Sequence, residues 1–292
     1  VLQAAQSFSL PSNKEILDVI AKQFIIDGEK GIKEPIGLHG VRLEAEIMVL
    51  GGFSPYIKNL TQAVLGSGLQ ISDISISPLV VSRGVLSQKQ KELGVAVLDI
   101  GAGATGLAVF EEGDLLHAAV FPVGSANITN DIAIGLRVDI ETAERIKIEF
   151  GSCFHKGGKR KERIKKINKE ESLSFSLKIL ADIIEARVSE IFDLTNKELK
   201  KISRQGKLPA GIVLTGGGAK LPNLVEFARK EFKLPCQIGY PSGISGIERD
   251  SSLASVTGLV LKGIDGEEEE TPLVFRKGFF SKVKGIFRIF LP

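Results

Sequence analysis

Two glycine-rich turns constrain the fold of this chain most, because each follows a run of residues typical of a buried strand. The first turn, with Gly101 and Gly103, comes after Val95–Ile100. The second, with Gly216, Gly217 and Gly218, comes after Ile212–Thr215. Without a Cβ, glycine lets backbone N–H groups approach an anionic oxygen closely. Together the turns predict a nucleotide held from two sides, although either turn alone also fits an ordinary bend.

Two charged side chains beside these turns extend the prediction. Asp99 closes the first strand, where we expect its carboxylate to hold Mg²⁺ through a water molecule, since Mg²⁺ keeps several waters in proteins. Lys220 follows the second turn and is expected to lie across the base of the nucleotide. The sequence therefore predicts a nucleotide site with a metal ion at Asp99.

The composition argues against several other classes of protein. The 292 residues are 43% hydrophobic and 25% charged with a net charge of +3, which is ordinary for a globular protein of one to three domains. Two cysteines, Cys153 and Cys236, are too few for a disulfide framework. The three histidines show no metal-ligand spacing. No stretch reaches the roughly 18 apolar residues of a membrane span.

The hydrophobic pattern alternates between helix-like and strand-like segments. It predicts helices over residues 12–22, 55–66, 78–86, 128–136, 140–150, 174–201, 222–232 and 251–261. It predicts strands over residues 23–26, 41–50, 71–76, 95–100, 105–110, 115–122, 211–215 and 235–239. The three strands between residues 94 and 123 form a predicted meander, and the second glycine turn lies in a βαβ-like unit.

The end of the chain has an amphipathic pattern beyond an acidic linker of five acids in residues 265–270. At 100° per residue, one stripe about 100° wide carries the apolar side chains Phe279, Val283, Ile286, Phe287 and Phe290, with Phe280 at its edge. The basic side chains outside this stripe are Lys277, Lys282, Lys284 and Arg288. Such a stripe often only covers a core, but beyond a solvated linker it favours a helix lying in a membrane interface.

A basic run from His155 to Lys169 carries eight Lys or Arg against the single acid Glu162. This basic run could bind an acidic peptide, contact an anionic membrane, or simply be solvated. Only Phe154 adds an aromatic side chain, so a single-stranded nucleic acid partner is not expected.

Several segments resemble, in fixed order, the FtsA family of bacterial cell-division proteins in the actin/Hsp70/hexokinase superfamily. The matching segments are residues 31–42, 91–95, 128–133, 143–147 and 210–218, and the resemblance extends over residues 1–261. It implies an α/β fold of the actin-like, ribonuclease H-like type, with two domains, an FtsA-type extra subdomain and a C-terminal amphipathic helix. The family's first phosphate loop has no counterpart here, so we expect the chain to be truncated at its N-terminus.

The resemblance also implies a division into domains. Residues 1–51 would be the remaining part of the extra subdomain. Residues 52–92 and 248–263 would belong to the first actin-like domain. Residues 93–247 would form the second, nucleotide-binding domain, with an inserted subdomain at about 125–205. A linker over 264–275 and the membrane-targeting helix 276–292 would follow.

Individual residues gain expected roles from the family. Gly101 to Thr105 would be the second phosphate loop, and Gly216 to Gly218 the adenosine loop, for ATP with Mg²⁺. Glu144 and Lys147, one helical turn apart, would contact ribose and base, although an ordinary surface ion pair has the same spacing. Arg187 is the first position to test for binding the C-terminal peptide of FtsZ.

The chain departs from the family's phosphate loop at three positions. Ala102, Ala104 and Gly106 replace a glycine, a threonine and an aspartate. The lost hydroxyl and carboxylate act near the γ-phosphate and metal in superfamily ATPases. We therefore expect ATP to be a structural ligand that is hydrolysed weakly at most.

The implied function is a peripheral protein on the cytoplasmic face of the cell membrane at the division septum. It would bind ATP, self-associate into filaments, anchor FtsZ filaments to anionic lipid and recruit later division proteins. Two alternatives share the fold. A pilus-assembly adaptor of the PilM type lacks the terminal helix, and a superfamily kinase or chaperone ATPase needs the groups that Ala104 and Gly106 replace.

Overall fold

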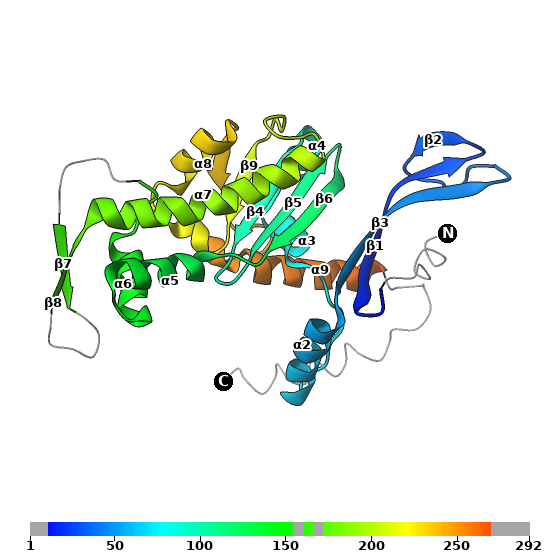
Figure 1. Cartoon of the computed structure of the whole chain (residues 1–292). Coiled ribbons are helices and arrows are strands. Elements are labelled where there is room, and N and C mark those ends of the chain that lie inside the picture. Colours follow the sequence, from blue (N-terminus) through cyan, green and yellow to red (C-terminus); the bar gives the residue numbers. More distant parts are fainter. Residues whose placement is uncertain (1–10, 155–160, 166–171, 270–292) are drawn as a thin grey trace.

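A five-stranded sheet forms the centre of the computed structural model, which describes residues 11–154, 161–165 and 172–269. Its strand order is β10-β9-β4-β5-β6 (Figure 1). The strands are β4 (Val95–Ile100), β5 (Thr105–Glu111), β6 (Asp114–Phe121), β9 (Ile212–Thr215) and β10 (Cys236–Ile238). β4, β5 and β6 form an antiparallel meander, whereas β9 runs parallel to both β4 and β10. The carboxyl ends of β4 and β9 therefore lie side by side.

Helices cover both faces of this sheet, as the complete burial of β4 and β9 requires. All six residues of β4 are buried, and they alternate between two cores, with Leu98 and Ile100 in one and Val95 and Val97 in the other. The first face carries α5 (Ser125–Leu136), α6 (Ile140–Phe150), α7 (Leu177–Lys201) and α8 (Leu224–Phe232). The second carries α3 (Ser77–Val85) and α9 (Ala254–Glu269), and α4 (Gln88–Leu93) leads into β4.

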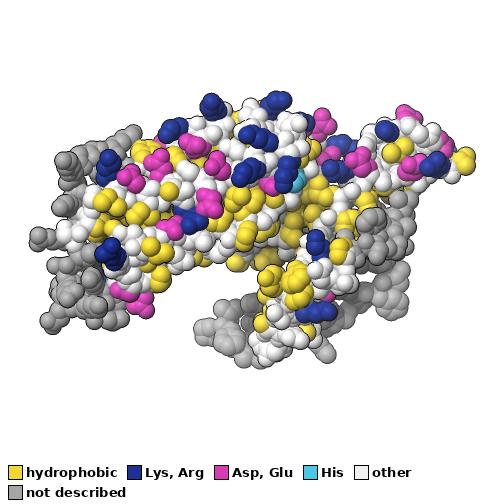
Figure 2. Space-filling view, viewed as in Figure 1, with side chains coloured by type: hydrophobic (Ala, Val, Ile, Leu, Met, Phe, Trp, Pro, Cys, Tyr) yellow, Lys and Arg dark blue, Asp and Glu magenta, His cyan; other side chains and the backbone are white. Residues whose placement is uncertain are grey.

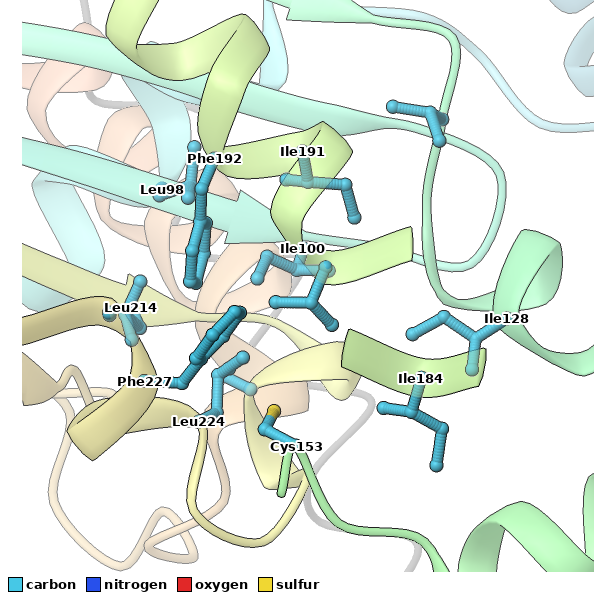
Figure 3. Packing of buried hydrophobic residues seen from close by; sticks show 14 of the residues in the cluster. Leu98, Ile100, Ile128, Cys153, Ile184, Ile191, Phe192, Leu214, Leu224 and Phe227 are labelled. Atoms are coloured by element: carbon cyan, nitrogen blue, oxygen red, sulfur yellow. The ribbon is translucent and has the colours of Figure 1, made fainter. Parts of the chain in front are cut away.

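The larger core lies between the sheet and α7 (Figure 3). Phe192 of α7 packs on Phe227 and Phe232 of α8, with ring centroids 5.7 and 4.7 Å apart. Leu98 and Leu214, on neighbouring strands, are fully buried in the same cluster. This packing fixes the ends of the two strands from which the glycine turns start.

A second sheet projects from this body (Figure 1). Its order is β2-β1-β3, with β1 (Lys14–Ile26) flanked by β2 (Glu29–Ile32) and β3 (Leu43–Phe53), and α2 (Ser54–Gly66) follows. Lys33 Nζ lies 2.8 Å from Asp114 Oδ2 and donates to the Glu112 carbonyl at 3.0 Å, which ties this sheet to the β5–β6 turn. A separate ribbon pairs β7 (Lys161–Lys165) with β8 (Ser172–Ser176).

The predicted meander, the βαβ-like unit and most helices are confirmed, but two predicted elements are wrong. Residues 12–22 are not a helix, because β1 pairs with β3 from Lys14 to Ile26 and that pairing overrides the local pattern. Residues 71–76 form no strand; they are joined to α9 by the ion pair of Asp73 with Lys262 at 2.7 Å.

Two helix ends also differ from the prediction. α7 begins at Leu177 because the residues before it pair with β7. The last helix starts with a 3₁₀ turn, η2 (Ser251–Leu253), and α9 continues to Glu269, into the stretch that was expected to be a linker. The amphipathic segment 276–292, the rest of the linker and parts of the basic run lie outside the described residues.

Candidate functional site

Asp99 lies at the end of β4 with its carboxylate almost enclosed. Asp99 is 8% exposed, and Ser77 Oγ of α3 donates to Asp99 Oδ2 at 3.0 Å. Burial raises the pKa of Asp99 above its usual value, and the hydrogen bond from Ser77 and the nearby Ser255 hydroxyl only partly oppose this. The chain therefore keeps a desolvated carboxyl group where the two strands end.

The first glycine turn connects β4 to β5 and is held by the start of α5. Gly101 N donates to the Ala104 carbonyl at 2.9 Å, and Ser125 N donates to the Gly101 carbonyl at 2.9 Å. A Cβ on Gly103 would meet nothing within 4 Å, so the tip of the turn is open. Thr105 is fully buried and its hydroxyl donates to the Val123 carbonyl at 2.8 Å, so its side chain supports the turn from inside.

The second glycine turn packs directly against the carboxyl end of β4. Gly216 has φ of +85°, and a Cβ there would lie 2.4 Å from Asp99 Oδ1. A Cβ on Gly218 would lie 2.4 Å from Ile100 Cγ2, whereas Gly217 has open space. These glycines are needed for close approach, and they bring the adenosine-loop candidates within reach of Asp99.

Lys220 ends the 3₁₀ turn η1 (Gly217–Lys220) and is paired rather than free. Its Nζ lies 2.6 Å from Asp250 Oδ2, and this pair lowers the pKa of Asp250 to about 2. Both residues border a hollow of about 710 Å³, with Tyr240 and Arg249 on its wall. The Arg249 guanidinium lies 4.5 Å from the centre of the Tyr240 ring.

Glu144 and Lys147 form the expected i,i+3 ion pair on α6, at 2.7 Å. Lys147 also donates to Thr129 Oγ1 at 2.8 Å and to the Ser125 carbonyl at 3.2 Å, and Thr129 Oγ1 donates to Glu144. Burial would raise the pKa of Glu144, but the bonds from Lys147 and Thr129 outweigh it and lower that pKa. Because Ser125 also holds Gly101, the pair is connected to the first turn.

Arg187 lies in a different place, on α7 facing α5. Its Nε and Nη2 donate to the Asp131 carboxylate at 2.7 and 2.9 Å, and Nη1 donates to Glu190; the bonds to Asp131 raise the pKa of Arg187. It borders a groove of about 430 Å³ together with the apolar Ile134 and Ile183. Figure 2 shows hydrophobic surface among charged side chains over the region of these helices. None of the glycine turns borders this groove.

Sequence reasoning missed three residues that contact the candidate site: Ser77 donates to Asp99, Asp250 pairs with Lys220, and Ser251 donates to Gly216. Asp250 and the two serines after it precede an apolar run, which is a recognisable helix start, and Ser77 precedes Pro78 at the first turn of α3. Those signals predict caps, and only the packing of the helices on β4 makes these side chains part of a site.

Within the described residues, no group of three or more Cys, His, Asp or Glu side chains is arranged to hold a metal ion. No helix in the described part of the chain is long and apolar enough to cross a membrane. A metal at Asp99 would therefore need further ligands, such as waters and the phosphates of a nucleotide.

The fold has clear relatives among solved structures. MreB5 of Spiroplasma citri bound to ADP superposes with a TM-score of 0.60 at 22% identity, over 74% of this chain and 67% of that one. A chain of the PilM–PilN type IV pilus biogenesis complex superposes with a TM-score of 0.64 at 18% identity, over 90% and 70%. With its two glycine turns at the strand ends, the chain is an actin-like α/β protein, as the sequence predicted.

Sequence comparison narrows this class to one family. Residues 96–258 match the family model of the cell division protein FtsA, and residues 1–50 match that of the SHS2 domain inserted in FtsA. The chain belongs to the FtsA family. FtsA of Pseudomonas aeruginosa is 35% identical over 92% of this chain, FtsA of Bacillus subtilis 38% over 89%, and FtsA of Escherichia coli 33% over 85%. The matches span 66%, 59% and 61% of those three relatives.

Proposed function

We propose that this chain binds ATP with Mg²⁺ and tethers FtsZ filaments to the cytoplasmic membrane during division. The main support for nucleotide binding is that Asp99, Gly101 and Gly216 lie close together at the adjoining ends of β4 and β9. Ligands of α/β sheets bind at the carboxyl ends of strands. The ADP named for the MreB5 relative supports the same ligand class.

In this proposal each turn binds a different part of the nucleotide. The open turn at Gly103 would donate backbone N–H groups to phosphate, and the glycines from 216 to 218 would approach the adenosine. Glu144 and Lys147 would bind ribose and base, with Lys220 beside the base. Asp99 fits a water-bridged Mg²⁺, because a cation would offset the unfavourable burial of its carboxylate.

We expect hydrolysis to be slow because Ala104 and Gly106 stand where the family's phosphate loop has a threonine and an aspartate. Gly106 pairs with Asp99 across the sheet, and a Cβ at Gly106 would lie 2.9 Å from Pro78 Cγ. An aspartate side chain at this position would therefore require Pro78 and α3 to move. The bound nucleotide would act as a structural ligand that joins the two turns.

Equilibrium binding of a fluorescent ATP analogue tests the proposal. Saturable binding that needs Mg²⁺, with competition by ATP and slow phosphate release, is the expected result. Absence of saturable binding would contradict the nucleotide site, and phosphate release at ordinary ATPase rates would contradict the structural role.

The groove at Arg187 is our candidate for the FtsZ peptide. Its paired guanidinium could exchange the Glu190 carboxylate for one on the peptide, while Ile134 and Ile183 would contact apolar side chains. Ile134 is 77% exposed, so the apolar part of the groove is accessible.

The membrane part of the proposal rests on the sequence of residues 276–290. Each basic residue near an anionic leaflet contributes about 1 kcal/mol, and the aromatic stripe adds the burial of apolar area. One such segment binds the membrane weakly. If the protein self-associates into filaments, many segments would bind the membrane together and the overall affinity would be high. In this proposal the protein would lie on the cytoplasmic face of the membrane at the septum, where later division proteins would join it.

A pilus-assembly adaptor remains a weaker alternative. The PilM chain shares the fold at 18% identity, whereas both family models that match this chain describe FtsA.

A further inference from the structure

A cross-link between two loops joins α6 to the second glycine turn. Asn223 Nδ2 donates to Ser152 Oγ at 2.7 Å, and Cys153 N donates to the Pro222 carbonyl at 3.0 Å. Ser152 and Cys153 lie just beyond the end of α6, whereas Pro222 and Asn223 lie just beyond η1. The cross-link therefore joins the helix that carries the ribose and base candidates to the turn that carries the adenosine-loop candidates.

The inner part of this cross-link belongs to the core. Cys153 is fully buried and Leu224, the first residue of α8, is 1% exposed, and both lie in the larger hydrophobic cluster (Figure 3). Packing thus holds the backbone hydrogen bond between Cys153 and Pro222 in place. This bond does not depend on the side chain of Asn223.

Asn223 occupies a position at which glycine would be the least strained residue. Its φ is +62°, in the left-handed region. An asparagine at the N-cap of a helix commonly accepts a hydrogen bond from the first N–H groups of that helix, but Asn223 makes no such cap on α8. Its amide instead donates to Ser152, whose hydroxyl donates onward to the Phe154 carbonyl at 2.8 Å. The side chain of Asn223 therefore serves the cross-link and not the helix.

The α6 side of the cross-link starts from the turn of the helix that bears Lys147. Gly151 N donates to the Lys147 carbonyl at 3.0 Å, and a Cβ on Gly151 would lie 2.2 Å from that oxygen. Ser152 is the next residue along the chain. A shift of Ser152 would therefore move the end of α6 that places Lys147 relative to the second glycine turn.

We infer that Asn223 is a positioning residue that sets the separation between α6 and the second glycine turn. In the proposed function, the ribose and base are bound by groups on both sides of this separation, with Glu144 and Lys147 on α6 and the glycines 216–218 on the turn. The phosphates would be bound at the other glycine turn. This inference rests on the proposed nucleotide function and adds a residue that affects binding of the nucleoside separately from binding of the phosphates.

Competition with a fluorescent ATP analogue in the presence of Mg²⁺ tests the inference. Asn223→Gly removes the amide and keeps the left-handed backbone without strain. It should weaken binding of ATP about fivefold, which is the loss expected for one hydrogen bond. Inorganic tripolyphosphate has no ribose or base, so its affinity should be unchanged.

Ser152→Ala removes the other partner of the side-chain hydrogen bond and should weaken ATP binding by a similar factor. Because both substitutions remove the same interaction, the double variant should bind ATP no more weakly than either single variant.

Lys233→Gly is the matched control, because Lys233 also has a left-handed backbone, with φ of +54°, at the opposite end of α8. Thermal unfolding without nucleotide shows whether each variant is folded. Four results would each overturn the inference while leaving the nucleotide site intact: unchanged ATP affinity in Asn223→Gly, an equal loss of tripolyphosphate affinity, the same loss in Lys233→Gly, or additive losses in the double variant. Failure of the unsubstituted chain to bind the analogue would overturn both the nucleotide site and the inference.

Discussion

Asp99 combines burial with a charge that the folded chain does not neutralise. Its carboxylate accepts a hydrogen bond from the Ser77 hydroxyl and has a pKa raised by desolvation, and the second turn approaches it with a glycine that leaves no room for a Cβ. Such a group lowers the stability of the folded state in return for a binding role. At the scale of a single residue, this is the strongest sign of function in the chain.

We predict that Asp99→Asn is more stable than the unsubstituted chain by about 1 kcal/mol at neutral pH, because an amide removes the desolvated charge. It should also lose the Mg²⁺ dependence of nucleotide binding. Denaturant unfolding and analogue binding measure the two effects. A variant that is less stable at neutral pH would contradict this account of Asp99.

The pH dependence of stability follows from the direction of the shift. Because the pKa of Asp99 is higher in the folded chain than its unfolded value of 3.8, the folded state binds the proton more tightly between the two values. The contribution of Asp99 to stability therefore falls as pH rises from that value through the folded pKa. Asp99→Asn should remove this slope in unfolding measured from pH 4 to pH 8.

Arg187 supports a third prediction at the residue scale. Arg187→Glu should weaken binding of the FtsZ C-terminal peptide by about 2 kcal/mol, because it replaces a cation of the groove with an anion. Arg204→Glu is the matched control, since Arg204 makes a comparable bidentate pair with Glu111 away from the groove. Fluorescence anisotropy of a labelled peptide gives both affinities, and equal affinities would remove Arg187 from the site.

At the scale of elements, local pattern predicted those strands and helices that agree with their packing. β4 and β9 are buried throughout, mostly apolar, and followed by glycine-rich turns, so both the strands and the turns could be predicted from the sequence. The structure of residues 12–22 could not be predicted in this way, because their pattern fits both one face of a helix and a strand. Only the pairing of β1 with β3 selects the strand.

The candidate site was predictable to the same extent. Glycines and charged residues beside a strand carry a recognisable pattern, which is why the two turns, Asp99 and Lys220 were found. Ser77 and Ser251 carry no such pattern, since a serine near a helix start is usually a cap. Their contacts depend on how α3 and α9 pack on β4, and the partner of Lys220 lies 30 positions along the chain.

The crossing of α3 and α9 gives a prediction for two glycines of one helix. Gly258→Ala should destabilise the chain by about 2 kcal/mol, because its Cβ would overlap the Val80 carbonyl. Gly263→Ala should instead stabilise it by up to about 1 kcal/mol, since that position is helical with nothing within 4 Å. Denaturant unfolding of both variants checks the pair, and similar shifts would contradict the described packing.

At the scale of the whole molecule, α7 connects the two sites for which we propose different functions. Its 25 residues extend about 37 Å. Phe192 and Ile191 lie in the core beneath the ends of β4 and β9, whereas Ile183 and Arg187 border the groove with α5. α5 likewise holds the first glycine turn through Ser125 and pairs with Arg187 through Asp131. The proposed nucleotide and peptide sites thus share two helices.

The proposed tether needs these sites and the terminal segment in one polypeptide. Co-sedimentation of FtsZ with anionic vesicles in the presence of ATP is the most direct test, comparing the 292-residue chain with one that stops at Glu269. We predict that FtsZ sediments with vesicles only when the 292-residue chain is present. Equal recruitment by the shortened chain, or FtsZ left in the supernatant with the longer one, would contradict the tethering function.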